Sequence, residues 1–400
     1  MLVILTTHPI QYQVPIWKAL AAAARVPFEV WYLTRHGVEP SRDSEFGQSF
    51  SWDIDMLSGY SHRFIDGGSD ATPVDTWSCR LRENFREQLS ARGATAVWIQ
   101  GWQVLAYWQA VRAARAAACE VWLRGESNDL GATPFWKRPF KRALLFWLFR
   151  RVDRFLYIGS ANKRLYRSFG VAEAKLYRAP YMVDNERFAR QAHALRGQRN
   201  ELRRAWGIPD DAFCVLFCGK FIAKKRPHDL IAAARRLKTD GRLPNIHLLF
   251  VGAGELGKAL REQCAVVFDA EKGGLANATA ANGEPPAASF AGFLNQTEIS
   301  KAYVAADCLA LPSDAGETWG LVVNEALASG LECLVSKACG CAEDLVSASF
   351  TFPAGDVAAL ADRIVSLARG ELHRPPGQLP SVEDNVAAVQ QAYGDLQARR

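Results

Sequence analysis

The sequence predicts an α/β protein of two doubly wound domains, each with a parallel sheet covered by helices. A chain of 400 residues is too long for one ordinary core, since a domain holds roughly 100–200 residues. Short apolar or β-branched runs alternate with helical patterns from end to end. The alternation restarts after a polar, Arg-rich stretch between Asp184 and Arg203. We therefore expect a first domain over residues 1–187 and a second domain over residues 188–381.

The individual elements follow from the period of the apolar residues and from the breaks between them. In the first half we expect strands at Leu2–Leu5, Phe28–Tyr32, Ala96–Ile99, Glu120–Leu123 and Arg154–Ile158, and helices at Gln13–Ala24 and Trp102–Ala117. In the second half we expect strands at Phe213–Phe217, His247–Val251, Ala288–Phe290, Cys308–Leu311 and Glu332–Val335. The helices there are expected at Pro227–Leu237, Gly257–Cys264, Gln296–Ala305, Leu321–Ser329, Val357–Ala368 and Val382–Arg399, with loops at Glu271–Pro286 and His373–Pro380. Parallel sheets of this kind bind ligands at the carboxyl ends of their strands.

Composition and charge narrow the class of protein. An apolar content of 49% and a charged content of 22% are typical of a globular protein. The net charge of +6 suits anionic ligands, whereas the basic residues form no nucleic-acid-binding module. Nine scattered Cys without a CxxC pair are typical of reduced thiols. MLVILTTHP lacks the basic segment of a signal peptide, and the longest apolar run, Ala143–Phe149, is far shorter than the about 20 residues of a membrane span. With the reduced thiols, these features lead us to expect a cytoplasmic protein that is neither secreted nor membrane-crossing.

The loop after the strand Phe213–Phe217 carries glycine and two cations. Gly219 lets the backbone approach a ligand, and the ammonium groups of Lys220 and Lys225 can neutralise a diphosphate. A solvated basic loop is the alternative interpretation. Either way, this loop lies at the ligand-binding edge of the predicted sheet.

Two further glycine turns follow strands in the second half. Gly252–Gly257 is a GxGxxG sequence between a strand and a helix, and with Asp269 it matches the fingerprint of a dinucleotide-binding site. The alternative is a tight turn whose glycines serve packing. Phe290–Phe293 is a second strand that runs into a glycine turn, and its backbone either contacts a base or forms a purely structural turn.

The most informative motif joins a loop to a helix and contains two carboxylates. Glu317 and Glu325 lie eight positions apart, with Gly320 between them at the predicted helix start. Free N–H groups at a helix start make an anion site. Glu317 can accept hydrogen bonds from sugar hydroxyls, and Glu325 can bind a ribose diol. Ordinary capping by one Glu and solvation of the other is the alternative.

These motifs together resemble the retaining glycosyltransferases of family 4. GETWGLVVNEALASG contains the E-x7-E motif of that family, and GKFIAKKRPHDLI, VGAGELGKAL and FAGFLNQTEISKAYVAADCLALPS resemble its other motifs in the same order. The first half is less similar, through VDRFLYIGSANKRLYRSFGV and YMVDNERF. The resemblance implies a GT-B fold, with two Rossmann-like domains facing a central cleft and a C-terminal helix, about residues 382–400, that returns to the first domain.

The resemblance also implies a role for each matching residue. Lys220 and Lys225 would bind the donor diphosphate beside Gly219, with Lys220 in place of the more usual Arg, and Glu317 would contact the donor sugar. These three charged residues form the predicted catalytic set. The predicted donor-binding residues are Gly219, Phe293 beside the base, Gly320, Leu321 and Val322 at a phosphate, and Glu325 at the ribose.

The first half gives weaker indications about the acceptor. His8, Gln11 and Gln13 follow the first strand, where many family members have a Gly-rich loop, and they can meet an acceptor. For His8, a helix cap or a turn hydrogen bond is an equal alternative. Arg124 also ends a strand and is grouped with His8 and Gln11 on the acceptor side. Family members often carry His at this place or after Ile99; this chain does not, so no residue is assigned as a catalytic base.

A basic aromatic stretch over residues 135–151 allows two interpretations. Such a helix can lie at an anionic membrane surface, at the inner face of the membrane. The other interpretation is a half-buried helix with solvated Lys and Arg side chains, and the shared helical face of Leu144, Leu145 and Leu148 favours it slightly.

Taken together, the sequence predicts a retaining hexosyltransferase that acts on a nucleotide-diphosphate sugar, with UDP as the expected nucleotide. The acceptor is a hydroxyl of a glycan, a lipid-linked glycan or a small molecule, as in polysaccharide or glycolipid biosynthesis. The resemblance implies that no metal or other cofactor is needed, and we find no DxD-like acidic pair placed to hold a metal. The alternatives are a non-catalytic protein of the same fold that binds sugar nucleotides or a membrane surface, and an NAD-dependent oxidoreductase.

Overall fold

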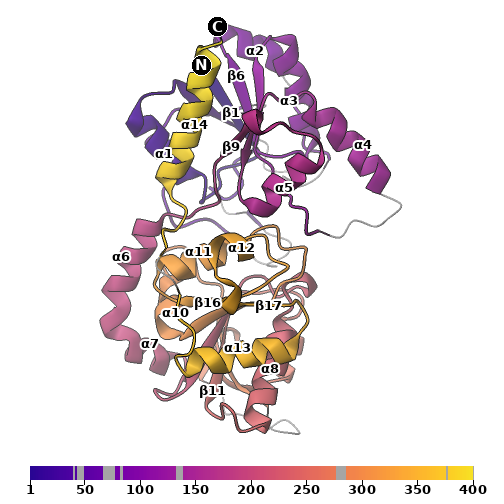
Figure 1. Cartoon of the computed structure of the whole chain (residues 1–400). Coiled ribbons are helices and arrows are strands. Elements are labelled where there is room, and N and C mark those ends of the chain that lie inside the picture. The colour runs from indigo at the N-terminus through magenta and orange to yellow at the C-terminus, as the bar shows by residue number, and fades with distance from the viewer. Residues whose placement is uncertain are drawn as a thin grey trace. The chain divides into compact units, whose positions relative to one another are not determined.

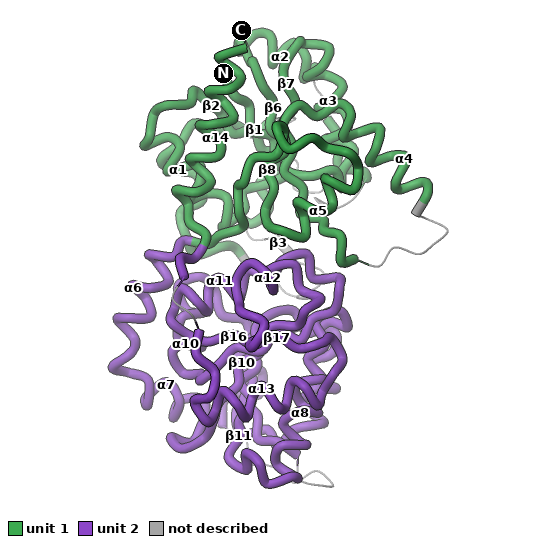
Figure 2. Tube along the Cα trace, viewed as in Figure 1, with its two compact units in different colours: residues 1–42, 49–183, 380–400 green, residues 43–48, 184–379 purple. Residues whose placement is uncertain are grey.

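The structure, a computed structural model, describes residues 1–38, 41–42, 49–65, 77–81, 84–131, 138–275, 285–374 and 377–399. They form two compact units, coloured separately in Figure 2. Unit 1 contains residues 1–42, 49–183 and 380–400, and the described part of unit 2 lies within residues 184–379.

Unit 1 contains a sheet whose recorded strand pairs are all parallel, in the order β5-β2-β1-β6-β7-β8-β9. These strands are β1 (Leu2–Thr6), β2 (Phe28–Tyr32), β5 (His62–Phe64), β6 (Ala96–Ile99), β7 (Glu120–Leu123), β8 (Arg154–Tyr157) and β9 (Leu176–Arg178). The helices are α1 (Val14–Ala23), α2 (Phe85–Ala91), α3 (Leu105–Ala116), α4 (Arg138–Phe149), α5 (Ser160–Ser168) and α14 (Val382–Gln397), as Figure 1 shows; β3 (Ser41–Arg42) and β4 (Ser49–Phe50) form a separate antiparallel pair.

Both faces of the unit 1 sheet are buried, because successive residues of a strand point to opposite sides. In β1, Val3 and Leu5 belong to one apolar cluster, and Leu2 and Ile4 belong to another. This explains why β1 reads as a continuous apolar run in the sequence.

The last helix, α14, lies in unit 1 although it follows unit 2 in the sequence. It packs against α1, and Val389 and Tyr393 join the apolar cluster that contains Leu2. The start of the helix is fixed by a capping box between Ser381 and Asp384.

Unit 2 contains an eight-stranded sheet in the order β13-β12-β14-β11-β10-β15-β16-β17, in which only β13 is antiparallel to its neighbour among the described strands. The strands are β10 (Phe213–Cys218), β11 (Ile246–Val251), β12 (Ala265–Asp269), β13 (Gly274–Leu275), β14 (Ala287–Gly292), β15 (Cys308–Leu311), β16 (Glu332–Ser336) and β17 (Thr351–Phe352). The helices are α6 (Asn185–Leu195), α7 (Arg199–Ala205), α8 (Pro227–Thr239), α9 (Gly257–Glu262), α10 (Ser300–Ala305), α11 (Leu321–Ala328), α12 (Ala342–Leu345) and α13 (Val357–Ala368).

The predicted fold class is confirmed, with two parallel α/β sheets and every predicted strand present. Three details of the prediction are wrong. The helix expected from Gln296 begins at Ser300, because residues 296–299 form a turn. The loop expected over Glu271–Pro286 contains the strand β13, and its residues 276–284 lie outside the described part. The strands β5, β9, β12, β13 and β17, several of them short and near the sheet edges, were not predicted.

Two expectations on the thiols and on the aromatic helix have different outcomes. All nine Cys are free and buried, as expected for small core residues.

In α4, Leu145 and Leu148 are buried, but Leu144 is 36% exposed, so the prediction that all three leucines face the core is wrong. Phe135–Lys137 lie outside the described residues. Within the described chain, the structure has no helix of the length and apolarity that a membrane span requires.

Candidate donor site in unit 2

The loop after β10 brings its glycine and Lys225 together. Gly219 has a φ of 144°, which favours glycine, and a side chain there would lie beside the Lys225 stem, 3.9 Å from Cε. The loop then forms a short 3-10 turn, Ala223–Lys225, and α8 begins with Pro227 at its first position. Lys220 lies on the same loop and is partly exposed.

The GxGxxG turn packs against this loop through its glycines. A Cβ at Gly252 would lie 2.1 Å from the carbonyl oxygen of Gly219, and a Cβ at Gly254 would lie 2.7 Å from backbone atoms of Phe221. The two segments are also hydrogen-bonded, from Gly219 N–H to the Val251 carbonyl over 3.0 Å and from Phe221 N–H to the Ala253 carbonyl over 2.8 Å. The glycines of the turn therefore hold the Lys220–Lys225 loop in place.

Asp269, the second part of the dinucleotide fingerprint, is used within the protein. Its side chain is fully buried, and both carboxylate oxygens accept hydrogen bonds from Arg261, at 2.8 and 3.0 Å. One of these oxygens also accepts the N–H of Glu271 at 3.2 Å. These contacts favour the packing interpretation of the turn over a ribose site.

Glu317 forms an ion pair with Lys225, although 92 residues separate them. Only 12% of the Glu317 side chain and 15% of the Lys225 side chain are exposed. The same carboxylate oxygen accepts a hydrogen bond from the hydroxyl of buried Ser313 at 3.3 Å. A pair of this kind is strongly coupled, so removing either partner leaves a largely buried charge without its counterpart.

The loop that carries Glu317 is fixed on two sides by backbone hydrogen bonds. Asp314 N–H donates to the Lys224 carbonyl at 2.9 Å, which joins it to the loop after β10. Gly340 N–H donates to the Glu317 carbonyl at 3.2 Å, which joins it to the turn after β16. The position of the Glu317 carboxylate is therefore set by the ends of β10, β15 and β16.

Gly320 directly precedes α11, and both its backbone conformation and the space around it suit only glycine. Its φ is 107°, and a Cβ would lie 2.6 Å from the Leu311 side chain. As the N-cap residue it has no side chain to bond the first-turn N–H groups, and Leu321 and Val322 are partly exposed. First-turn N–H groups have no partner within a helix, so this start can bind an anion.

Glu325 lies one turn further along α11 and is buried, with 2% of its surface exposed. It accepts a hydrogen bond from the hydroxyl of Tyr303 on α10. Burial and the charge of Glu325 raise the pKa of the Cys218 thiol, at the end of β10, to about 12. The carboxylate therefore lies near the same strand end as the Lys220–Lys225 loop.

Phe293 follows β14, one strand beyond β11 in the sheet. The Gly292 carbonyl before it accepts the N–H of Gly252 at 2.8 Å, so the two glycine turns are neighbours. Phe293 is partly exposed. The structure thus brings Gly219, Lys225, Glu317 and Gly320 into one cluster, with Glu325, Lys220 and Phe293 at the adjoining strand ends.

In unit 1, His8 and Gln11 follow the end of β1. His8 Nδ1 lies 2.9 Å from the Thr7 hydroxyl, and its ring makes an edge contact with His36 at 5.0 Å. Burial, with a smaller contribution from His36, lowers the pKa of His8 to about 3. Gln11 is buried in the turn before α1. His8 is therefore a neutral imidazole already engaged in a turn contact.

Arg124 directly follows β7 and is only 2% exposed. Its Nη1 donates to Asn385 of α14 at 3.3 Å, and its guanidinium lies over the Tyr181 ring at 5.0 Å. Burial lowers its pKa to about 10, so it keeps its charge at neutral pH. These contacts give Arg124 a role in holding α14.

Sequence analysis missed Ser313 and Tyr303, which touch the two carboxylates. Ser313 lies in the loop just after β15 and was recognisable by the strand-end rule that found Glu317. Tyr303 lies inside α10, where nothing in the local pattern distinguishes it from a core aromatic residue. The described residues contain no group of three or more His, Cys, Asp or Glu side chains arranged to hold a metal ion.

Comparison with known proteins relates part of the chain to a described family. Residues 198–375 match the family described as glycosyl transferases group 1, and this stretch lies within unit 2 and contains every residue of the cluster. The chain is 32% identical over 158 residues to a D-inositol 3-phosphate glycosyltransferase of Actinosynnema mirum, a match that covers 39% of this chain and 34% of that protein. The chain spans about a third of the length of the curated relatives it matches.

Solved structures are similar over nearly the whole chain. Anabaena HepE in complex with UDP has a TM-score of 0.62 at 15% identity, covering 99% of this chain and 96% of that one. A glycosyltransferase from Rickettsia africae also has a TM-score of 0.62, at 12% identity and covering 100% and 93%. At this identity the likeness shows the fold alone: the protein has the GT-B fold of two Rossmann-like units.

Proposed function

We propose that the protein is a glycosyltransferase that moves a sugar from a nucleoside diphosphate sugar to a hydroxyl acceptor. The observation that carries the proposal is the Lys225–Glu317 ion pair beside the uncapped start of α11. It combines a cation, a carboxylate and free backbone N–H groups at the carboxyl edge of one sheet. The group 1 family match over residues 198–375 supports the same activity.

The reaction breaks the bond between the anomeric carbon and the diphosphate oxygen and forms a new bond from that carbon to the acceptor oxygen. Negative charge grows on the departing diphosphate, while the acceptor hydroxyl loses its proton. Fixed positive groups at the diphosphate therefore lower the barrier more than they stabilise the bound donor. Lys220, Lys225 and the first-turn N–H groups of α11 supply that charge in our proposal.

The ion pair suggests how donor binding begins. Without donor, the Glu317 carboxylate accepts a hydrogen bond from the Lys225 ammonium group. The carboxylate thus holds the cation in place and balances its charge. A diphosphate brings more negative charge than one carboxylate and competes for Lys225. Glu317 is then released to accept hydrogen bonds from the hydroxyls of the donor sugar. Glu325 binds the ribose, and Phe293 lies beside the base.

The finer assignments are part of the same proposal. We take the donor to be a UDP-sugar, since HepE, which shares the fold, was solved with UDP and with UDP-glucose. Retention of anomeric configuration, transfer of a hexose and independence of metal come from the resemblance of GETWGLVVNEALASG to family 4. The acceptor is a glycan, a lipid-linked glycan or a small molecule, and His8, Gln11 and Arg124 stay predictions for the acceptor side.

A ligand panel followed by a turnover assay tests the proposal. Purified protein is melted with UDP, GDP, ADP, dTDP or NAD, since a ligand at 100 times its Kd adds about 2.7 kcal/mol to stability and raises Tm by a few degrees. We expect a shift with UDP, and then release of UDP from a UDP-sugar. A shift with NAD alone would contradict the donor site. UDP binding without turnover of any UDP-sugar would favour a non-catalytic binding protein.

A further inference from the structure

The helix α4 of unit 1 is apolar on both of its sides. Leu145, Leu148 and Phe149 face the core and are at most 4% exposed. On the other side, Phe140 is 75% exposed and Phe146 is 46% exposed. A helix on the surface of a globular protein ordinarily presents polar residues to water, so the outer side of α4 requires another explanation.

Tryptophans extend the exposed apolar surface beyond α4. Trp147 is 38% exposed and stacks on Trp108 of α3, with ring centroids 5.8 Å apart. Trp77, which is 54% exposed, also lies beside Trp108, with ring centroids 6.2 Å apart. We call Trp77, Phe140, Leu144, Phe146 and Trp147 the α4 patch. Tryptophan is the residue most typical of the boundary between a bilayer and water.

The charged side chains described on α4 and on the two residues that follow it are all positive. Lys141 and Arg142 are exposed on the helix, Arg150 is exposed directly after it, and Arg151 lies over the Trp147 ring at 3.7 Å. The sequence contains no Asp or Glu between residues 131 and 152. Glu173, on a neighbouring turn, is paired with Lys163 and Arg167. An apolar patch on a helix whose own charges are all positive is complementary to an anionic lipid surface.

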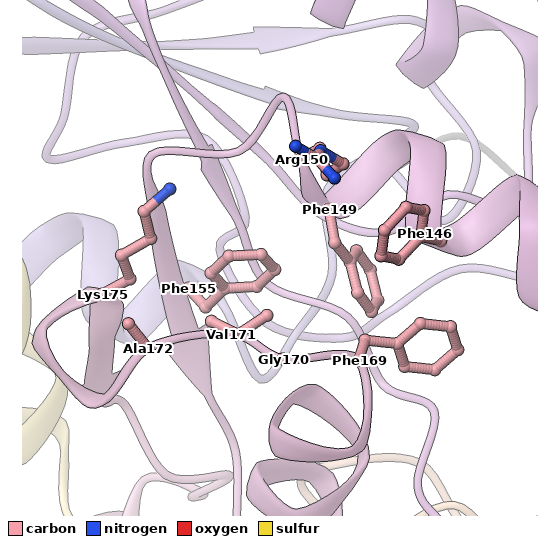
Figure 3. Close-up of a pocket in the computed structure, with 9 residues that line it drawn as sticks. All are labelled: Phe146, Phe149, Arg150, Phe155, Phe169, Gly170, Val171, Ala172 and Lys175. Atoms are coloured by element: carbon pink, nitrogen blue, oxygen red, sulfur yellow. The ribbon is translucent and has the colours of Figure 1, made fainter.

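A cavity of about 280 Å³ opens between α4 and the turn after α5. Figure 3 shows the residues that line it, which come from α4 and the residue after it, from β8 and from residues 169–175: Phe146, Phe149, Arg150, Phe155, Phe169, Gly170, Val171, Ala172 and Lys175. Its walls are mainly aromatic or aliphatic, and its two charged residues are cations. This volume is just below the roughly 300–1,000 Å³ of sites that enclose drug-sized molecules, so the cavity suits part of a chain rather than a compact ligand.

The cations of the cavity are positioned for a headgroup. Lys175 Nζ donates to the Val152 carbonyl at 3.0 Å, and the Arg150 guanidinium lies over the Phe146 ring at 5.3 Å. Both side chains are therefore held at the cavity while their charges are balanced by no recorded carboxylate in the described part of the chain. Apolar walls and bordering cations are the combination that an anionic amphiphile matches.

We propose that unit 1 docks on an anionic phospholipid surface through the α4 patch, and that the adjoining cavity receives one acyl chain. This goes beyond the transferase proposal, because it concerns unit 1 alone and needs no donor chemistry. It places the protein at the surface of a bilayer by insertion of side chains. Two simpler kinds of lipid binding differ from this proposal. Binding through charge alone would not require the exposed aromatic residues, and binding through apolar residues alone would not depend on anionic lipid.

Co-sedimentation with vesicles tests the docking. The full-length protein is mixed with vesicles of phosphatidylcholine, or of phosphatidylcholine containing about a third phosphatidylglycerol, at low salt. We expect binding to the anionic vesicles, weakened by Trp147→Ser through the loss of an inserted aromatic side chain. Arg150→Glu should weaken it at least about 5-fold, from the roughly 1 kcal/mol that each basic residue contributes near such a surface. Leu275→Ser and Arg190→Glu, exposed positions in unit 2, are the matched controls and should bind as the wild type does.

Three results would overturn the docking proposal. They are no binding to anionic vesicles, equal binding to both kinds of vesicle, and equal loss in the patch variants and the controls. Circular-dichroism melting of each variant shows that lost binding is not lost folding. An acidic protein partner, instead of a lipid, would leave vesicle binding absent and so count against the proposal.

The cavity has its own measurement. The fluorescent fatty acid cis-parinaric acid brightens when its chain enters an apolar site, and it is titrated into the protein without vesicles. We expect saturable binding in the wild type and at least about 10-fold weaker binding in Ala172→Trp, whose indole would fill the cavity at an exposed position. Unchanged binding in Ala172→Trp would show that the chain site lies elsewhere. Ala143→Trp, on the exposed side of α4, controls for an added tryptophan.

Discussion

The carboxyl edges of the two sheets have the same architecture but different chemistry. In unit 2, glycine turns with positive φ at Gly219 and Gly320 bring backbone and charge together around the Lys225–Glu317 pair. In unit 1, the strand ends carry Arg124 and His8, which are engaged with Asn385 and Thr7 of the same unit. At the unit 2 edge, glycines leave room for a ligand beside charged side chains. At the unit 1 edge, the charged and polar side chains named here are used in contacts that support the fold.

The largest effect should come from removing the cation of the unit 2 edge. Lys225→Ala should lower kcat by about 100- to 1,000-fold, the range found when one preorganised donor to a developing oxyanion is lost. Donor affinity should fall less, because the charge on the departing diphosphate grows in the transition state. Steady-state kinetics with a UDP-sugar measure both quantities. Lys258→Ala, an exposed lysine of α9, is the control, and equal kcat in the two variants would contradict the assignment.

The packing role of the GxGxxG turn predicts a large loss of stability. In Gly252→Ala, the new methyl group would meet the Gly219 carbonyl at a φ of 129°, and we expect a loss of about 2–4 kcal/mol. Gly273→Ala also has a positive φ, 86°, but open space around it, so it should lose only about 1 kcal/mol. Urea unfolding measures the difference. Similar losses in both variants would mean that the turn does not brace the Lys220–Lys225 loop.

A third prediction concerns the pH dependence of the stability of unit 2. Burial, with a smaller contribution from Arg203, lowers the pKa of His247 to about 4, against an unfolded value near 6.5. Between these values the unfolded chain binds more protons, so stability falls as the pH falls, by up to about 1.4 kcal/mol per pH unit. Urea unfolding at pH values from 4 to 7 should show a shallower dependence in His247→Gln. The exposed His193→Gln should keep the wild-type slope, and an unchanged slope in His247→Gln would contradict the prediction.

Most of the central fold could be predicted from the sequence, because parallel strands buried on both faces form continuous apolar runs such as Leu2–Leu5 and Cys308–Leu311. The strand β12 was missed since Ala265–Phe268 are only partly buried and lie near a sheet edge. Glu317 and Lys225 were found individually through the rule that parallel sheets bind at their carboxyl ends. Their ion pair was not, because 92 residues separate them and local patterns contain no pairing information.

The central claim is that the donor diphosphate replaces Glu317 as the partner of Lys225. A variant of Glu317 tests this claim without removing the positive charge of Lys225. Glu317→Gln removes the carboxylate that competes for Lys225 while keeping a hydrogen-bonding side chain. The account predicts that UDP binds this variant as tightly as the wild type or more tightly, while turnover of the UDP-sugar falls at least about 10-fold. Isothermal titration of UDP beside a turnover assay measures both. Weaker UDP binding together with unchanged turnover would contradict the claim that the donor diphosphate takes Lys225 from Glu317.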